Sequence, residues 1–319
     1  MTFRVAGAAR ATIGARSDQE DAFAIWPPSA GASIGEGARL LAVVADGMGG
    51  HAGGEVAARV ACDAFVAAFV ECGGTVGERL DAALDAGNWA ISARAAEDPK
   101  LRGMGSTLVA ASIDETGLRW ASVGDSALLL FRAPDVLRLN ADHSLGALLD
   151  AEARNKRISA DEAARNPHRN ALLSALTGKR IEIRDLRSEP YSLRSADWLI
   201  VASDGIATLS GDEIGDIVYA NRASEPDQMA ERLIAAVLAK KDPVQDNTTV
   251  IALKIEGDTI PVAEDERPTR ILRATDGPSG DGAGGGEAAA MLTGRYGVML
   301  AVGMGLMFLI GWLLRAVLE

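Results

Sequence analysis

Acidic residues recur where short apolar runs of this sequence end or begin. Asp46 directly follows LLAVVA, and the pair Asp246-Asn247 directly precedes TTVIALKI. A carboxylate at the end of an apolar strand costs free energy unless an opposite charge compensates it. If these strand ends meet at one edge, the acids lie together and their mutual repulsion calls for cations. The six acids of this kind are Glu20, Asp21, Asp46, Asp125, Asp204 and Asp246.

The ligands that this pattern offers are all oxygen atoms. Cys62 and Cys72 show no metal-ligand spacing, and the 3 histidines form no cluster. Oxygen ligands favour a hard cation, Mg²⁺ or Mn²⁺, over Zn²⁺. Two such ions sharing carboxylates would form a two-metal centre that activates water for in-line attack on phosphorus. Any single Asp-Gly is also typical of a turn, so the hypothesis depends on the whole set of acids.

Strands and helices must position these acids, and both types are expected. Close spacing of the runs 107–113 and 118–123 predicts a hairpin, hence antiparallel pairing and a mixed α+β class. Helical spacing of apolar residues predicts helices that begin near Gly53 and Gly77. Further helices are expected over 144–156, 211–221 and 225–240. Short β-branched runs predict strands at 40–45, 107–113, 118–123, 127–132, 198–202 and 248–255.

The C-terminal part of the sequence has a different composition. Residues 257–294 are rich in Gly, Pro and acids, which predicts a flexible linker after a working domain of residues 1–256. From Tyr296 to Leu314 the chain carries no charge, and as a helix it would span roughly 28 Å, close to a bilayer core. We expect a transmembrane helix over 295–315 and a short tail, 316–319. A buried core helix is the alternative interpretation.

Charge and the N-terminal residues suggest where the chain acts. The formal net charge is −12, and no block of Lys or Arg indicates a nucleic-acid partner. The first residues lack the apolar core of a signal peptide, and the low cysteine content fits a reducing compartment. We expect a single-pass protein of the inner (cytoplasmic) membrane with its N-terminal domain in the cytoplasm.

Seven segments then occur in an order that resembles a known family. They are RSDQED from Arg16, DGMGGH from Asp46, GMGSTLVAA, SVGDS, ADHSL, VASDGI and DNTTVIAL. Together they resemble the metal-dependent serine/threonine protein phosphatases of type 2C (the PPM family) in their bacterial form, over roughly residues 1–256. The resemblance implies two antiparallel sheets packed face to face between helices, an αββα sandwich. It also implies two Mn²⁺ or Mg²⁺ ions and a third, weaker metal site.

The same resemblance implies metal ligands at particular positions. Asp46 would bridge two metals, with the Gly47 carbonyl as a further ligand. Glu20 would serve one of these metals, and Asp204 and Asp246 would serve the other.

Three further roles follow from the resemblance. Asp21 would orient the reacting water, and Asp125 would help Asp204 hold the third metal. Arg16 would bind the substrate phosphate, a role that suits the planar fork of donors on a guanidinium.

The sequence also departs from the family pattern. Gln19 stands where the family usually has Asn, and Ala127 and Ser174 stand where it usually has Arg. These departures put in doubt the network around the third metal and the substrate.

The group that protonates the leaving oxygen is not assigned by the sequence. Met48 occupies the position of a histidine that some relatives use as general acid. A metal-bound water or His51 could supply the proton, although His51 could also only shape a turn. His143 fits a structural role better than a catalytic one.

Three functions fit this set of residues. The first is hydrolysis of phosphoserine and phosphothreonine in proteins, opposing a bacterial serine/threonine kinase. The second is a membrane-tethered regulator that binds phosphoproteins without turnover; retention of all the metal-binding acids favours activity over this reading. The third, an aspartyl-phosphate hydrolase, is disfavoured because no Lys follows an Asp-Gly strand end as a supporting residue would.

Overall fold

The computed structural model describes residues 3–28, 32–34, 39–49, 53–257 and 270–271. The chain divides into a first compact unit, Met1–Ala274, and a second, Thr275–Glu319. The predicted transmembrane helix lies in the second unit, outside the described residues. Within the described ranges, no helix is both long enough and apolar enough to cross a bilayer.

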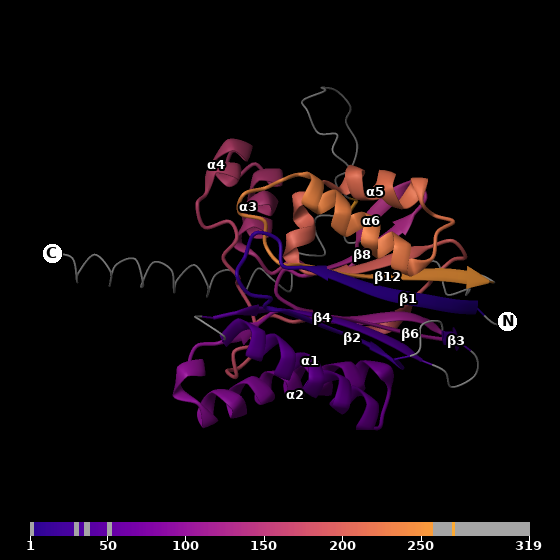
Figure 1. The fold of residues 1–319 in the computed structure, drawn as a ribbon. Helices are drawn as coiled ribbons and strands as arrows, with labels where there is room; N and C mark the ends of the chain where they lie inside the picture. Colours follow the sequence, from indigo (N-terminus) through magenta and orange to yellow (C-terminus); the bar gives the residue numbers. More distant parts are fainter. Residues whose placement is uncertain (1–2, 29–31, 35–38, 50–52, 258–269, 272–319) are drawn as a thin grey trace. The chain divides into compact units, whose positions relative to one another are not determined.

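Two antiparallel sheets form the centre of the first unit (Figure 1). The first sheet has the order β13-β9-β8-β11-β12-β1-β3. Its strands are β1 (Phe3–Thr12), β3 (Ala32–Ile34), β8 (Ala127–Arg132), β9 (Asp135–Arg138), β11 (Trp198–Ala202), β12 (Thr248–Gly257) and β13 (Arg270–Ile271). The second has the order β10-β7-β6-β4-β2, with β5 paired to β4. Its strands are β2 (Asp21–Trp26), β4 (Leu40–Met48), β5 (Gly105–Ser106), β6 (Leu108–Asp114), β7 (Gly117–Val123) and β10 (Asp185–Tyr191).

Helices cover the outer face of each sheet. In Figure 1, α1 and α2 lie against the sheet of β2, β4 and β6, and α5 and α6 lie against the sheet of β1, β8 and β12. The α-helices are α1 (Gly53–Glu71), α2 (Val76–Glu97), α3 (Leu145–Arg154), α4 (Ala160–Arg165), α5 (Gly211–Ala220) and α6 (Pro226–Ala239). Short 3₁₀ turns occupy Pro99–Leu101 and Asp204–Thr208.

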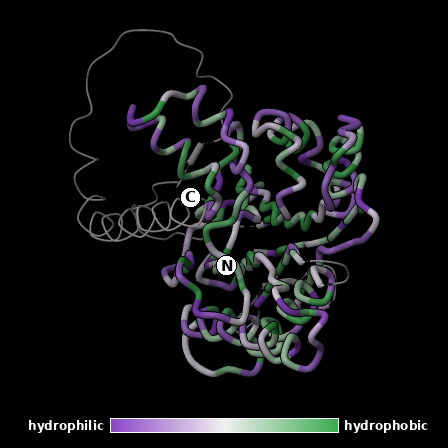
Figure 2. Tube along the Cα trace, turned by 90° about the vertical axis from the view of Figure 1, so that its left-hand side faces the viewer, coloured by the Kyte–Doolittle hydropathy of each residue, from purple (hydrophilic) through white to green (hydrophobic). Residues whose placement is uncertain are grey.

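Three apolar layers hold these elements together. One lies between the sheets and includes Val44, Leu130 and Leu253. The second packs α1 and α2 onto their sheet, and the third does the same for α5 and α6. In Figure 2 the hydrophobic colour follows strands inside the unit, whereas hydrophilic colour is frequent in its outer turns. Burial of alternate strand faces in different layers explains why central strands such as β4, β6 and β11 are apolar along most of their length.

Local sequence signals account for where the helices begin. Thr75 caps α2 by accepting a hydrogen bond from the backbone of Glu78, whose side chain in turn caps Thr75. Ser210 and Glu213 form the same reciprocal box at α5. Such boxes satisfy backbone N–H groups that have no partner inside the helix.

The predicted α+β class with two packed antiparallel sheets is confirmed. Each of the six predicted strands is present, as is the hairpin of β6 and β7. The sequence patterns did not predict β1, β2, β9, β10 or α4. Within the stretch predicted as a linker, Arg270–Ile271 forms β13 and pairs with β9. The remaining domain boundaries stay predictions.

Candidate active site

Sheet register explains how the acidic residues come to one edge. Asp21 opens β2 and pairs directly with Asp46 near the end of β4. In the other sheet, Thr12 at the end of β1 pairs with Thr248 at the start of β12. The end of β11 and the start of β8 lie at the same end of the sheet as the Thr12–Thr248 pair. The reason is that Ala202 pairs with both Val250 and Ala127. The acids that flank these strands therefore face the same end of the sandwich.

A cleft of about 770 Å³ opens at this end. Its walls include Arg16 and Gly47 together with five of the six predicted acids; Asp21 is not among the lining residues. A neighbouring cleft of about 630 Å³ shares part of this wall. The residues common to both are Arg16, Asp125, Asn170, Asp204 and Asp246. The acid cluster is therefore accessible from two sides.

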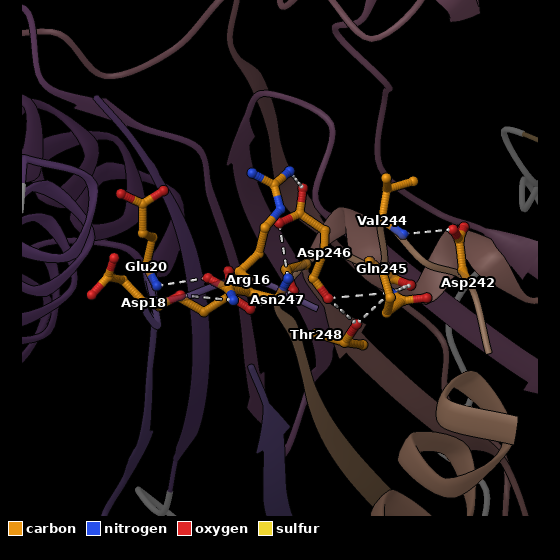
Figure 3. Close-up of polar contacts among 12 residues, drawn as sticks. Arg16, Asp18, Glu20, Asp242, Val244, Gln245, Asp246, Asn247 and Thr248 are labelled. Carbon is orange, nitrogen blue, oxygen red and sulfur yellow. Dashed lines mark hydrogen bonds and ion pairs between the residues drawn. The ribbon is translucent and has the colours of Figure 1, made fainter. Parts of the chain in front are cut away.

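Arg16 lies in the loop between β1 and β2 and reaches across to the start of β12. Its Nη2 donates to Asp246 Oδ2 at 2.6 Å (Figure 3). Its side chain remains 54% exposed, so part of the guanidinium stays accessible to a ligand. A phosphate bound there would meet a planar group with several donors.

Asn247 clamps the loop that carries Arg16 and Glu20. Its Oδ1 accepts the backbone N–H of Glu20 at 2.7 Å. Its Nδ2 donates to the carbonyl of Ile13 at 2.9 Å and to that of Asp18 at 3.0 Å (Figure 3). The buried amide thus joins β12 to both ends of the loop, and it fixes where Glu20 stands.

Neighbouring polar side chains hold Asp21 and Asp46. Ser203 donates its hydroxyl to Asp21 Oδ2 at 2.7 Å, while its oxygen accepts the Thr249 N–H at 2.9 Å. Thr107 Oγ1 accepts the Asp46 N–H at 3.1 Å. The first contact holds the carboxylate of Asp21 through one oxygen and leaves its Oδ1 without a partner, and the second holds the backbone of Asp46.

Burial and mutual repulsion raise the pKa of several carboxyls in this cluster. Burial, followed by the charges of Asp21, Asp204, Asp125 and Asp246, raises the pKa of Asp46 well above its ordinary value. Burial, followed by the charge of Asp246, raises the pKa of Asp204, although Asp46, Arg16 and the Gly205 backbone oppose this shift.

Two carboxyls of the cluster have pKa values in the neutral range. Burial, only partly opposed by the Ser203 and Thr249 hydroxyls, raises the pKa of Asp21 to about 6. Burial and the nearby Asp204 and Asp142 raise the pKa of Asp125 to about 7. Protons bind these groups tightly because charged oxygens crowd one buried site, and a cation would relieve the same crowding.

The donor set fits divalent metal ions. Asp21 Oδ1 and Asp204 Oδ1 are buried and have no hydrogen-bond partner. Buried carboxylate oxygens are normally paired or bound to a metal. Among the described residues, no three Asp, Glu, His or Cys side chains are arranged as ligands around one point.

Two of the departures from the family pattern, Gln19 and Ala127, lie beside the acids. Gln19 Oε1 accepts the Asp21 N–H at 3.1 Å. Ala127 opens β8, and Arg138 from β9 instead donates to the carbonyls of Asp125 at 2.7 Å and Ser126 at 3.2 Å. Arg138 also pairs with Asp142 at 2.9 Å. A guanidinium therefore lies beside Asp125 although residue 127 is not an arginine.

The candidate proton donors lie in different places. Met48 lines the 770 Å³ cleft, and His51 lies outside the described residues. His143 is buried, and its Nδ1 accepts the Gly124 N–H at 3.1 Å. It lines a separate pocket of about 290 Å³, which favours the structural role expected for it.

Sequence reasoning missed the residues that position the acids. Ser203 and Asn247 are each adjacent in sequence to a predicted ligand, and each is buried. A polar residue beside an acid at the end of a buried strand is the signal that could have identified them.

The fold and site define a class of two-sheet sandwiches that carry an acid-lined cleft at one sheet edge. The family model of protein phosphatase 2C matches residues 10–245. The chain belongs to the protein phosphatase 2C family.

Several relatives support this assignment. Serine/threonine protein phosphatase PstP of Mycobacterium tuberculosis is 36% identical over 228 residues, 70% of this chain and 41% of PstP. The chain therefore spans about two-fifths of that relative. Protein phosphatase PhpP of Streptococcus pneumoniae is 32% identical over 197 residues, 58% of this chain and 75% of PhpP.

Solved structures agree with the fold. The crystal structure of M. tuberculosis PstP matches with a TM-score of 0.65 and 30% identity, covering 80% of this chain and 100% of that one. The PstP catalytic domain in complex with 2 manganese ions matches with a TM-score of 0.63 and the same identity and coverage.

Proposed function

We propose that this protein hydrolyses phosphoserine and phosphothreonine in proteins with the help of divalent cations. The observation that carries the proposal is the convergence of the acid cluster and Arg16 on one cleft. Membership of the protein phosphatase 2C family and the names of PstP and PhpP support it.

Mn²⁺ or Mg²⁺ is the cofactor that the oxygen donors would hold. Glu20, Asp46, the Gly47 carbonyl, Asp204 and Asp246 would hold these ions, and all five residues line the same cleft. Bound divalent cations would supply Lewis acidity and neutralise the charge that develops on the phosphoryl group. The manganese ions in the related PstP domain support this choice, and Asp125 with Asp204 would hold a third, weaker ion.

The chain's own residues bind and orient the substrate. Arg16 would bind phosphoryl oxygens through guanidinium N–H groups that are not used by Asp246. Asp21, held by Ser203, would keep its free oxygen available to orient the attacking water and accept its proton. Positioning of this kind lowers the barrier because the reacting groups are already aligned.

Metal-dependent release of phosphate from a phosphothreonine peptide by the full chain tests this function. We expect Mn²⁺ to support turnover, a chelator to abolish it, and Asp204→Ala to reduce it at least a hundredfold. Asp161→Ala is the matched control, since Asp161 is exposed on α4, where it pairs with Arg165. A folded protein without turnover in either Mn²⁺ or Mg²⁺ would instead support the hypothesis of a regulator that binds phosphoproteins without hydrolysing them.

We also propose that the segment from Tyr296 to Leu314 anchors the protein in the inner membrane, with the catalytic domain in the cytoplasm. Its uncharged sequence supports this proposal. Anchoring would raise the local concentration of the enzyme near membrane-bound phosphoproteins, including a serine/threonine kinase as partner. Fractionation of cells that express the full chain or a chain ending at Ala274 tests the anchor. Recovery of both in the soluble fraction would exclude it.

A further inference from the structure

Residues 174–183 form a closed loop beside the acid cluster. At its base, Ser174 donates its hydroxyl to the Ile183 carbonyl at 2.7 Å and accepts the Ile183 N–H at 3.3 Å. Ser174 is buried. The residue that departs from the family pattern therefore joins the two ends of this loop.

The 174–183 loop is also fastened to two neighbouring elements. Asn88 on α2 accepts the N–H groups of Thr177 at 3.0 Å and Gly178 at 2.9 Å, and it donates to the Lys179 carbonyl at 2.6 Å. Leu176 exchanges two backbone hydrogen bonds with Ser106, at 2.8 and 2.9 Å.

Gly178 allows the loop to lie this close to α2. It has φ +75°, and a Cβ there would meet Ser92 of α2 at 2.6 Å. The tip of the loop is consequently held in one place, with little conformational entropy left to lose on binding.

Two basic residues lie at this fixed tip. Lys179 and Arg180 are exposed and line the same 770 Å³ cleft as Arg16 and the acids. Neither forms an ion pair with any of the described residues. Arg184, just beyond the loop, instead pairs with Asp81 at 2.6 Å and Asp85 at 2.9 Å. The acids of α2 thus neutralise Arg184, whereas Lys179 and Arg180 remain available to bind an anion in the cleft.

We propose that Lys179 and Arg180 form an anion subsite that binds a negatively charged residue close to the phosphorylated residue of the substrate. This inference rests on the proposed function. The ligand would be a carboxylate or a second phosphoryl group, since both match an ammonium beside a guanidinium fork. Glu182, the loop's single acid, also lines the cleft, so the subsite carries a net positive charge of one from these three side chains.

The competing explanation is that both cations are ordinary solvated residues that moderate the negative potential of the cleft. That explanation predicts a similar effect from the loss of other exposed cations, because a general field sums over all charges and acts on every charged group of the substrate. A subsite predicts an effect of Lys179 and Arg180 in particular, and only on substrates with an anionic neighbour. The two explanations therefore separate when the loss of these two cations is compared with the loss of two cations elsewhere.

The test compares kcat/KM of the full chain on three substrates. They are a phosphothreonine peptide flanked by glutamates, the same peptide with glutamines, and p-nitrophenyl phosphate. For Lys179→Gln/Arg180→Gln we expect a three- to tenfold loss on the glutamate peptide, about the size of two exposed ion pairs. The other two substrates should change less than twofold. A peptide with a second phosphothreonine distinguishes phosphoryl from carboxylate preference.

The matched control is Arg232→Gln/Lys241→Gln, which removes the same two charge types from exposed positions in and just after α6. It should leave all substrates unchanged. Equal losses on every substrate, or the same selectivity change in the control, would overturn the subsite. Higher salt should reduce the preference of the wild type for the glutamate peptide.

A binding measurement keeps this inference separate from the proposed function. Fluorescence anisotropy in a chelator reports the affinity of the wild type for the glutamate and glutamine phosphopeptides. Tighter binding of the glutamate peptide that the double variant loses supports the subsite even in a protein that shows no turnover. Turnover without any preference in either measurement rejects the subsite and leaves the proposed function standing.

Discussion

Asn247 illustrates how an uncharged side chain controls the position of charged ones. Its three hydrogen bonds join β12 to the loop before β2, where Arg16 and Glu20 lie. Because the amide is buried, each lost bond leaves a backbone group without its partner. Residues of this kind affect a metal site through the ligands that they position.

Replacement of Asn247 by Ala should therefore weaken metal binding as well as folding. We expect the Mn²⁺ concentration for half-maximal activity to rise about tenfold or more. The free energy of unfolding of the metal-free protein should fall by about 1–3 kcal/mol. Asn221→Ala is the control, because Asn221 donates to the Ile217 carbonyl on α5. If both variants changed the metal requirement equally, the positioning role would be wrong.

The carboxyls of Asp21 and Asp125 should make stability depend on pH. Their pKa values rise from 3.8 to about 6 and about 7 in the folded protein. A raised folded pKa contributes stability below the unfolded pKa, and this contribution is lost as pH rises through the folded pKa. In a chelator, Tm should accordingly fall between pH 5 and pH 8.

Asp125→Asn isolates one of these two groups. Thermal unfolding of this variant in chelator should show a smaller decline over the same pH range. Added Mn²⁺ should raise the Tm of the wild type more at pH 8 than at pH 5, because ligand carboxyls must lose their protons. An equally steep decline in the variant would remove Asp125 from this explanation.

At the scale of elements, two loops that lie about 230 residues apart in the sequence form one wall of the site. The Ala15 N–H donates to the Gln245 carbonyl at 2.8 Å, and Arg16 pairs with Asp246. Gly14 permits this approach, since it has φ +64° and a Cβ there would strike the Asp246 carbonyl. The position of Arg16 thus depends on a residue without a side chain.

Gly14→Ala should displace this loop. We expect a loss of more than about 1 kcal/mol in the free energy of unfolding, together with a lower kcat/KM because Arg16 moves. Gly103→Ala is the matched control, with φ +84° and nothing within 4 Å of the added Cβ. It should lose stability through its backbone alone and keep its activity. Denaturant unfolding of both variants measures the backbone strain. Steady-state kinetics then show whether kcat/KM falls in Gly14→Ala alone, as displacement of Arg16 requires.

At the scale of the whole molecule, β13 extends the first sheet beyond the predicted domain end. Arg270–Ile271 pairs with β9, which would otherwise be the edge of this sheet. The cleft lies at the strand ends, and the residues proposed to bind metal and phosphate all lie between Arg16 and Asp246. The C-terminal residues should consequently affect stability more than catalysis.

Two truncations test this separation. Chains that end at Ala274 and at Gly257 should both hydrolyse p-nitrophenyl phosphate at nearly the full rate. The shorter chain should have a lower Tm, because it loses β13 and exposes the β9 edge. Loss of most turnover in a folded chain ending at Ala274 would show that the C-terminal unit takes part in catalysis.

The sequence by itself predicted the strands that flank Asp46, Asp125, Asp204 and Asp246, and it singled out these acids as candidates. Apolar runs such as LLAVVA and WLIVA are local patterns, and so are the polar residues that end them. The order of these segments also sufficed to suggest the family and its two-sheet fold. Local signals do not specify which loops meet, so the hydrogen bonds from Asn247 to the loop before β2 were not predicted. Strands β1 and β2 were not predicted either.

Only the tertiary structure decided which distant residues act together. Arg16 meets Asp246 because β1 and β12 pair in a register that brings Thr12 opposite Thr248. In the same way, only the folding of the 174–183 loop onto α2 places Lys179 inside the cleft. Strand register and loop packing depend on contacts across the whole sheet, and no local window of the sequence contains that information.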